Sequence, residues 1–473
     1  MTAPEEQSAT VDTIRALAHA VHNYDVKDVA AAAMHQAQLL LLDTIGCGIA
    51  ALHDDVARGV ADVVLHDSGS TECPLIGRPQ RTSILNAVLL NGVAIRVVDL
   101  NDYAVDTSKA EPETAGHPSD NIPVALALAA ARGRSGAAML AAIVLGYELY
   151  ARLQKSMNRA GAWDGVTITG LVAPAMAGWL MGLDEDKLGH ALAFGAARAA
   201  TPAIVRTGHI SSAKSIANAL VAQSGVQAAL LAEAGLTGPL AILDDARGLR
   251  DLFARGYPSL LTEALPSTGA IMRAHVKAYP CINTAQGAVA AALKLRAMLN
   301  GPAETLSHIE IVMADYAIVK RQQEDEARAW PQSREAADHS FPFLVAVTLL
   351  DGAFGPEQFE NERWHDPHVK VLMEKITMRR DAGWNARAPG AFPCTLRAQT
   401  REDRDIMAEI VYPPGFSKNG LDETAVIEKF HAVTAPLIDK AARARIVDAV
   451  MEFHHSRTTA ALETAIAIEG ASP

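Results

Sequence analysis

Four separated segments of the chain carry ionisable side chains that could act together in one reaction. One runs from Asp99 to His117, and the other three surround Asp164, Lys214 and Lys277. Two lysines can bind carboxylates as compact point charges, and a His with an Asp can move protons to and from a carbon and a hydroxyl. These residue types therefore favour acid–base chemistry on a polycarboxylic acid without a cofactor.

A fifth segment, Asp338–Ser340, also carries polar side chains that could act in the reaction. It precedes an apolar stretch, so it could equally cap a helix. Asp, His and Ser in one tripeptide are not a hydrolase triad, because such triads assemble from distant parts of a chain. The sequence has no G-x-S-x-G elbow and no P-loop, and no G-x-G-x-x-G follows a strand. His and acidic residues do not recur at metal-ligand spacing, so we expect neither a cofactor nor a metal.

Composition narrows the class of protein further. The formal charge is −12 without a basic stripe, which argues against nucleic acid as a partner. The longest nearly uninterrupted apolar stretch, Gly136 to Gly146, is far shorter than the roughly 20 residues of a membrane span. The N-terminus is polar and acidic, unlike a secretion signal. The four cysteines are scattered without a CxxC pair, so we expect reduced thiols. Together these features predict a cytoplasmic protein that is not bound to a membrane.

The segments that could do chemistry must be positioned by helices. The stretch from residue 91 to residue 123 is expected to contain a polar loop between two buried helices, because Pro112, Gly116 and Pro118 interrupt helical structure there. Such a loop can carry function, although a solvated surface loop is the alternative. Lys214 falls in the first turn of a helix expected to begin at Ser211 or Ser212 and to run to about Ala234. There it could help to bind an anion or simply point to solvent.

Hydrophobic periodicity predicts a mainly α protein with a large helical domain. Helices are expected at about residues 26–52, 82–98, 122–132, 135–157, 171–182 and 185–200. From about residue 265 short strands alternate with helices, which predicts a smaller α+β lid domain over residues 265–412. The chain then returns to helix, so residues 1–264 and 413–473 are expected to form one discontinuous helical domain.

The order of several motifs resembles that of the MmgE/PrpD family, which includes 2-methylcitrate dehydratases, cis-aconitate decarboxylases and an iminodisuccinate epimerase. The matching pieces include LLDTIGCGIAAL, HPSDNIP, GAWDGVT, SAKSIANALVAQSGVQAALLAEAGLTGP, KAYPCINTAQ and ADHSFPFLVAVTLLDG. They run in the family's order over nearly the whole chain. The resemblance implies a homodimer, with the active site between a large helical domain and a smaller α+β lid.

The resemblance also implies roles for single residues. Asp99, His117, Lys214 and Lys277 match the family's loop acid, loop His and two site lysines, and are the expected catalytic set. The residues expected to bind substrate are Tyr103, Asp102, Asp164 and His339. Tyr103 and Asp164 stand where the decarboxylases have Thr and His. Three further positions depart from the family pattern, namely Arg96, Asn101 and Ile282.

These departures count against a decarboxylase. The form of ADHSFPF is closer to that of the 2-methylcitrate dehydratases, so the resemblance favours a cofactor-independent hydro-lyase of that type. In that reading Lys214 and Lys277 bind substrate carboxylates, and His117 is the general base or acid. Asp99 orients His117 or shares its proton. The alternatives are an epimerase, a cis-aconitate-type decarboxylase, and an inactive homologue that only binds a carboxylic acid.

Overall fold

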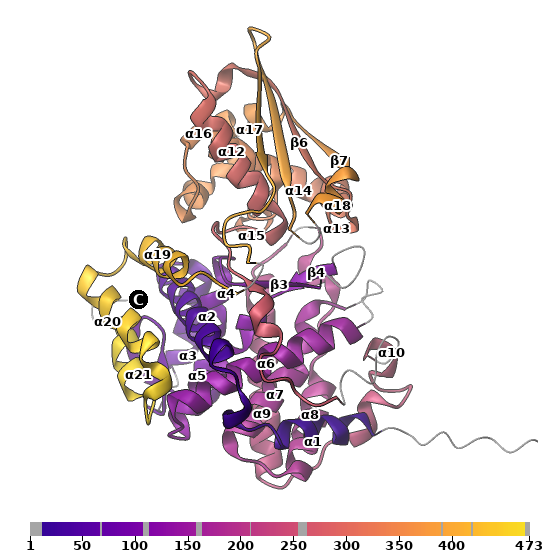
Figure 1. The fold of residues 1–473 in the computed structure, drawn as a ribbon, viewed down its shortest axis with the longest axis vertical. Helices are drawn as coiled ribbons and strands as arrows, with labels where there is room; N and C mark the ends of the chain where they lie inside the picture. Colours follow the sequence, from indigo (N-terminus) through magenta and orange to yellow (C-terminus); the bar gives the residue numbers. More distant parts are fainter. Residues whose placement is uncertain are drawn as a thin grey trace, which may run out of the picture.

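A bundle of long helices rich in Ala and Leu forms the larger part of the protein (Figure 1). The computed structural model describes residues 12–66, 69–106, 113–157, 163–208, 210–253, 263–388, 391–417 and 420–468. The helices of the bundle are α1 (Thr13–His22), α2 (Ala31–Ala50), α3 (Asp55–His66), α4 (Ile84–Val97), α5 (Ile122–Ala131), α6 (Gly136–Ser156), α7 (Thr169–Met181), α8 (Glu185–Arg198), α9 (Ala213–Glu233) and α10 (Arg250–Phe253). Helices α2 and α4 to α9 lie close to the positions expected from periodicity, whereas α3 and α10 lie in segments for which no helix was expected.

Small residues allow these helices to approach closely. A Cβ added to Gly92 in α4 would lie only 2.8 Å from Cβ of Ala219 in α9. This close contact fixes the C-terminal end of α4, where Arg96 lies, relative to the first turn of α9, where Lys214 lies. Packing of small residues therefore sets the spacing of two charged side chains that are far apart in sequence.

From the sequence we expected only a loop between α4 and α5, but this segment also contains two short strands. These are β3 (Tyr103–Asp106) and β4 (Glu113–Gly116), which pair antiparallel. Residues 107–112, including Pro112, lie outside the described residues. Strand β3 also pairs with β5 (Ala274–His275), with Tyr103 opposite His275. This pairing brings the segment that contains Lys277 alongside the segment that contains Asp99. The other small sheet of the larger part is β1 (Cys73–Leu75) paired with β2 (Arg78–Thr82).

The smaller domain is built on a four-stranded sheet in the order β7-β6-β8-β9. Its strands are β6 (Leu306–Ala314), β7 (Ile376–Asp381), β8 (Cys394–Thr400) and β9 (Asp405–Ile410), with β6 and β7 parallel and the other pairs antiparallel. Its helices are α12 (Gln286–Met298), α13 (Ala317–Glu324), α14 (Glu326–Ala329), α15 (Arg334–Ala337), α16 (Phe341–Asp351), α17 (Pro367–Met373) and α18 (Gly383–Arg387). This domain has its own hydrophobic core, separate from that of the bundle.

The C-terminal helices return to the bundle, where Figure 1 shows them beside α2. They are α19 (Glu423–Thr434), α20 (Lys440–Met451) and α21 (Ala460–Ile466). Gln38 of α2 donates hydrogen bonds to the carbonyl oxygens of Val450 and Met451, at 2.9 and 2.6 Å. The architecture confirms the predicted fold class, a helical domain with a smaller α+β domain. The residue limits 1–264 with 413–473 and 265–412 remain our proposal for the division.

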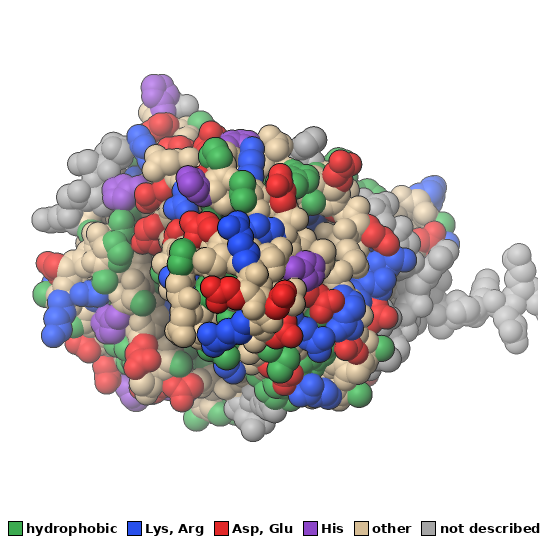
Figure 2. Space-filling view, turned by 90° about the horizontal axis from the view of Figure 1, so that it is seen from above, with side chains coloured by type: hydrophobic (Ala, Val, Ile, Leu, Met, Phe, Trp, Pro, Cys, Tyr) green, Lys and Arg blue, Asp and Glu red, His purple; other side chains and the backbone are tan. Residues whose placement is uncertain are grey.

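Two further features, the apolar helices and the surface charge, concern the expectation that neither a membrane nor nucleic acid is a partner. Helices α6 and α9 are long and apolar enough to cross a membrane, but 78% and 61% of their apolar windows are buried inside the protein. Buried core helices commonly meet the same criteria. Figure 2, which views the molecule from the side of the smaller domain, shows acidic and basic side chains mixed over that face, without a continuous basic area.

Candidate active site

The candidate site is centred on Asp99, which lies two residues after the end of α4 and has a left-handed backbone with φ of 51°. Three cations share its carboxylate. Lys277 Nζ lies 2.6 Å from Oδ1 and also donates to the Asp99 carbonyl oxygen at 2.9 Å. Arg96 Nη1 donates to the same Oδ1 at 2.6 Å, and Lys214 Nζ lies 3.3 Å from Oδ2. The unusual backbone at Asp99 therefore places both its carboxylate and its carbonyl oxygen within reach of buried cations.

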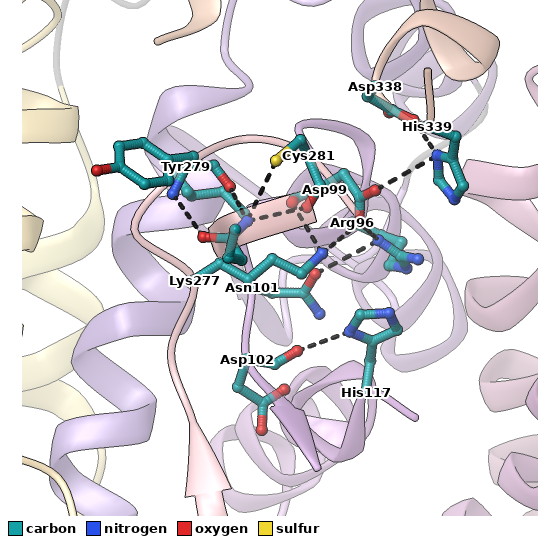
Figure 3. Close-up of polar contacts among 12 residues, drawn as sticks. Arg96, Asp99, Asn101, Asp102, His117, Lys277, Tyr279, Cys281, Asp338 and His339 are labelled. Carbon is teal, nitrogen blue, oxygen red and sulfur yellow. Dashed lines mark hydrogen bonds and ion pairs between the residues drawn. The ribbon is translucent and has the colours of Figure 1, made fainter. Parts of the chain in front are cut away.

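Asp338 forms the other half of the network and comes from the smaller domain. Lys214 Nζ donates to both of its carboxylate oxygens, at 3.0 and 2.9 Å. Arg334 Nη1 donates to Oδ2 at 2.9 Å, and His339 Nδ1 pairs with Oδ1. Lys214 thus joins Asp99 of the larger domain to Asp338 of the smaller one. Figure 3 shows Asp338 and His339 meeting Asp99 and Arg96 from the opposite side of the site.

Burial and charge set the ionisation of this network. Burial opposes ionisation of Asp99, but Lys214, Lys277 and Arg96 hold its pKa well below the usual value. Burial likewise opposes ionisation of Asp338, and Lys214 with His339 lowers its pKa to about 2. Burial and the nearby Asp99 act in opposite directions on Lys277, and its pKa is lowered. In direct contact, four cations surround two ionised carboxylates, so the network has an excess of positive charge and favours an anionic ligand.

His117 lies beside this network with one ring nitrogen already engaged. Its Nδ1 is 2.6 Å from the carbonyl oxygen of Asp102, so this nitrogen carries the proton and donates it. Nε2 is then the unprotonated nitrogen and can accept a proton. Burial, followed by the charges of Arg96 and Lys277, holds the pKa of His117 well below the usual value. The ring is therefore neutral at physiological pH, as a general base must be.

The structure corrects the expected relation between Asp99 and His117. We expected Asp99 to orient His117 or share its proton, but the ring is oriented by the carbonyl oxygen of Asp102 instead. Figure 3 shows the Asp102 carboxyl group directed away from the cations, while its carbonyl oxygen faces His117. That carboxyl group accepts hydrogen bonds from Tyr147 Oη at 2.7 Å and from Ser119 N at 3.2 Å. Burial raises its pKa to about 7. Asp102 therefore holds the loop and is not placed as a substrate ligand.

Two other predicted substrate-binding residues have different surroundings from those expected. Tyr103 is fully buried in the core of the smaller domain and packs against His275, with ring centroids 5.0 Å apart. Asp164 caps a short 3-10 helix by accepting from Val166 N at 3.0 Å, and its other oxygen accepts from Arg206 Nε at 2.9 Å. These contacts give Asp164 a structural role. The ring of Tyr103 packs in the core, but its buried hydroxyl group has no hydrogen-bond partner among the described residues. His339, by contrast, lies in the network as expected, and burial lowers its pKa to about 3.

Several members of the site were not singled out from sequence. Arg96 was noted only as a departure from a family pattern, and Asp338 only as part of a capping segment. Arg334 was not noted, although Arg96–Asp99 and Arg334–Asp338 have the i,i+3 and i,i+4 spacings at which helical residues meet. That spacing was the available signal. The contact between Lys214 and Asp338 spans 124 residues and left no local signal.

One group in the described part of the chain has donors suited to a metal ion. Ligand atoms of Asp99, Asp338 and His339 lie within 4.8 Å of one another. The ammonium group of Lys214 already lies among them and contacts all three side chains. A divalent cation at this position would have to displace that ammonium group. The donor set is therefore better explained as a binding site for the lysine side chain.

Comparison with known proteins matches both parts of the chain to domains of one family. Residues 15–260 match the family model described as MmgE/PrpD N-terminal domain, and residues 279–453 match MmgE/PrpD C-terminal domain. A cis-aconitate decarboxylase of Mus musculus is 27% identical over 76% of this chain and 74% of its own length. A 2-methylcitrate dehydratase of Cupriavidus necator is 27% identical over 87% of both chains. Another of Salmonella typhimurium is 25% identical over 91% of this chain and 92% of its own.

Proposed function

Because the chain belongs to the MmgE/PrpD family, we propose that it is a cofactor-independent lyase for a small di- or tricarboxylic acid, of the 2-methylcitrate dehydratase type. The observation that carries the proposal is the buried network itself. Four cations surround two ionised carboxylates, directly beside a neutral imidazole with a free Nε2. Excess positive charge suits a substrate with several carboxylates, and the imidazole supplies a base.

The chemistry assigned to these groups is an elimination of water. His117 Nε2 removes a proton from a carbon next to a substrate carboxylate, and the electrons of that C–H bond form the new C=C bond. The C–O bond on the neighbouring carbon breaks, and the hydroxyl group leaves as water after it gains a proton. Burial lowers the pKa of His339 to about 3, so its ring is neutral, and we assign the donation of that proton to the neighbouring ammonium group of Lys214. The nearby cations stabilise the negative charge that develops on the carboxylate.

Decarboxylation of the same class of acid is the second candidate. The decarboxylase of Mus musculus and the dehydratase of Cupriavidus necator share the same 27% identity with this chain. Both reactions need a cation-rich site and a proton carrier, so the network supports either. Measurement of the product separates them, since dehydration yields an alkene and decarboxylation releases carbon dioxide.

The test is a panel of citrate-like acids, scored first by thermal shift. Acids that stabilise the protein are then assayed for alkene absorbance, carbon dioxide release, and exchange of the hydrogen next to the carboxylate with deuterium. Alkene formation supports the dehydratase proposal, carbon dioxide release supports the decarboxylase, and deuterium exchange without an alkene indicates an epimerase. Binding without any reaction would show an inactive homologue.

Two lysine variants serve as a matched pair in this panel. Lys214→Met should abolish the thermal shift, because Lys214 is buried in the network. Lys294→Met should leave the shift unchanged, because Lys294 is exposed and its ammonium only contacts the Glu409 carbonyl oxygen. Equal shifts in the two variants would contradict the proposed site.

We also propose that the protein acts as a cytoplasmic homodimer, as the family resemblance implies. Sedimentation of the purified chain tests the dimer, and cell fractionation tests the location. A monomer with full activity would show that the site is complete within one chain.

A further inference from the structure

Arg96 differs from the two lysines of the site in how its hydrogen-bonding capacity is used. Lys214 divides its ammonium group between Asp99 and Asp338, and Lys277 gives its own to Asp99. Both lysines are 1% exposed or less. Their charge contributes to the site, but their donors are already occupied by protein groups in this conformation. A substrate carboxylate would have to compete with Asp99 and Asp338 for them.

The guanidinium group of Arg96 has donors left over. Its Nη1 donates to Asp99 and lies 3.5 Å from Asn101 Oδ1. Nε is buried and has no hydrogen-bond partner, and Nη2 has none among the described residues. The side chain is only 2% exposed. A buried donor without a partner, such as Nε, is costly, and an arginine presents its Nε and Nη2 donors as a fork that matches a carboxylate.

Asp120 is the group that could have filled this fork, but it does not. Its Oδ2 stays 3.8 Å from Arg96 Nε, beyond hydrogen-bond distance. Its Oδ1 accepts instead from Asn101 Nδ2 at 2.9 Å, which holds the carboxyl group in that position. Asp120 thus offsets part of the charge of Arg96 without satisfying its donors.

The free donors lie close to the proposed base. Figure 3 shows the guanidinium group of Arg96 and the ring of His117 facing one another, with the Lys277 ammonium group nearby. The positive charge of Arg96 also acts on the His117 ring. An anion bound by Arg96 would therefore lie beside Nε2 of His117.

We propose that Arg96 forms a carboxylate subsite, in which its Nε and Nη2 bind the substrate carboxylate that flanks the carbon deprotonated by His117. This inference rests on the proposed function and assigns direct carboxylate contact to Arg96. The lysines supply charge and hold Asp99, and Lys214 also donates the proton to the leaving hydroxyl group. The ligand class is an acid with several carboxylates, since the surrounding network keeps an excess of positive charge.

The experiment measures the dissociation constant of tricarballylate, a tricarboxylate without a hydroxyl group, by calorimetry on the full chain. Arg96→Met should weaken binding by about 10- to 100-fold, the range for loss of hydrogen bonds to a charged group. Arg96→Lys keeps the charge but not the fork, so its affinity should fall between the two. Asp120→Asn should tighten binding by about fivefold, because it removes the competing negative charge.

Arg152→Lys is the matched control, because Arg152 is also a buried arginine paired with an acid, Glu148, at 2.7 Å. It should leave the affinity unchanged. If the wild type binds tricarballylate and the Arg96 and Asp120 variants bind it with the same affinity, the subsite is overturned while the proposed function stands. A wild type that binds no carboxylic acid would overturn both. If Arg96→Met does not fold, Arg96→Lys and Asp120→Asn still decide the question by their opposite directions.

Discussion

Asp99 and Asp102 are buried carboxyl groups three residues apart, and replacing each by Asn should change stability very differently. Both are 1% exposed or less. Asp99 is ionised and forms ion pairs with Arg96, Lys214 and Lys277 at 2.6 to 3.3 Å. Asp99→Asn leaves these cations without their shared carboxylate. Removing one partner of a buried ion pair costs about 3–5 kcal/mol, so we expect a loss of unfolding free energy of that size.

Among the described residues, no cation lies in hydrogen-bond contact with the Asp102 carboxyl group. Its carboxyl group accepts from Tyr147 Oη and Ser119 N, and burial raises its pKa to about 7. An asparagine can keep an oxygen acceptor for Ser119 N and is always neutral. Asp102→Asn should therefore cost no more than about 1 kcal/mol near neutral pH, the size of one ordinary hydrogen bond.

The two variants should also respond differently to pH. The lowered pKa of Asp99 means that its contribution to stability is complete above the pKa of the unfolded chain and is lost only in strong acid. The raised pKa of Asp102 has the opposite sign. Between about pH 4 and about pH 7 the folded protein keeps a proton that the unfolded chain has released, so this group makes stability fall as pH rises. At about 1.4 kcal/mol per pKa unit the effect amounts to a few kcal/mol.

The assay is thermal unfolding of the wild type and both variants in matched buffers from about pH 5 to about pH 8. Asp99→Asn should unfold at a lower temperature throughout this range. Asp102→Asn should show a flatter pH dependence than the wild type and should equal or exceed it at the upper end. Equal unfolding temperatures for the two variants at neutral pH would refute the assignment of Asp99 as the charged centre of the network.

Three further predictions concern the base, the loop and the bundle. His117→Ala should lower turnover by about 100- to 10,000-fold in a steady-state assay while the unfolding temperature changes little, and unchanged turnover would remove His117 from the mechanism. Lys429→Met should destabilise the protein by about 3–5 kcal/mol in denaturant unfolding, because Lys429 pairs with buried Asp43 at 2.6 Å and donates to the Leu100 carbonyl oxygen at 2.9 Å. Lys429→Arg should recover most of that loss if charge is the cause. Gly136→Ala should destabilise by about 1–3 kcal/mol or more, since the added Cβ would lie 1.8 Å from the Phe453 carbonyl oxygen. Gly59→Ala is its control, has open space around the Cβ, and should not lower the unfolding temperature.

The sequence by itself determined the elements and the broad class. Hydrophobic periodicity located helices such as α4, α6 and α9 to within a few residues, because a buried helical face must repeat at its own period. The change near residue 265 predicted the smaller α+β domain for the same reason. The sequence also supplied Lys214, Lys277, Asp99 and His117 as candidates, since their residue types suit acid–base chemistry on a carboxylic acid.

Only the tertiary structure decided how those side chains combine. The left-handed backbone at Asp99 and the pairing of β3 with β5 bring Lys277 onto Asp99 across 178 residues. Packing of α4 on α9 brings Lys214 to the same carboxylate. No local pattern records such contacts, because they depend on the direction in which each side chain leaves a folded backbone. For the same reason, only the structure shows that the carboxyl group of Asp102 points away from the site and that Nε of Arg96 has no hydrogen-bond partner within it.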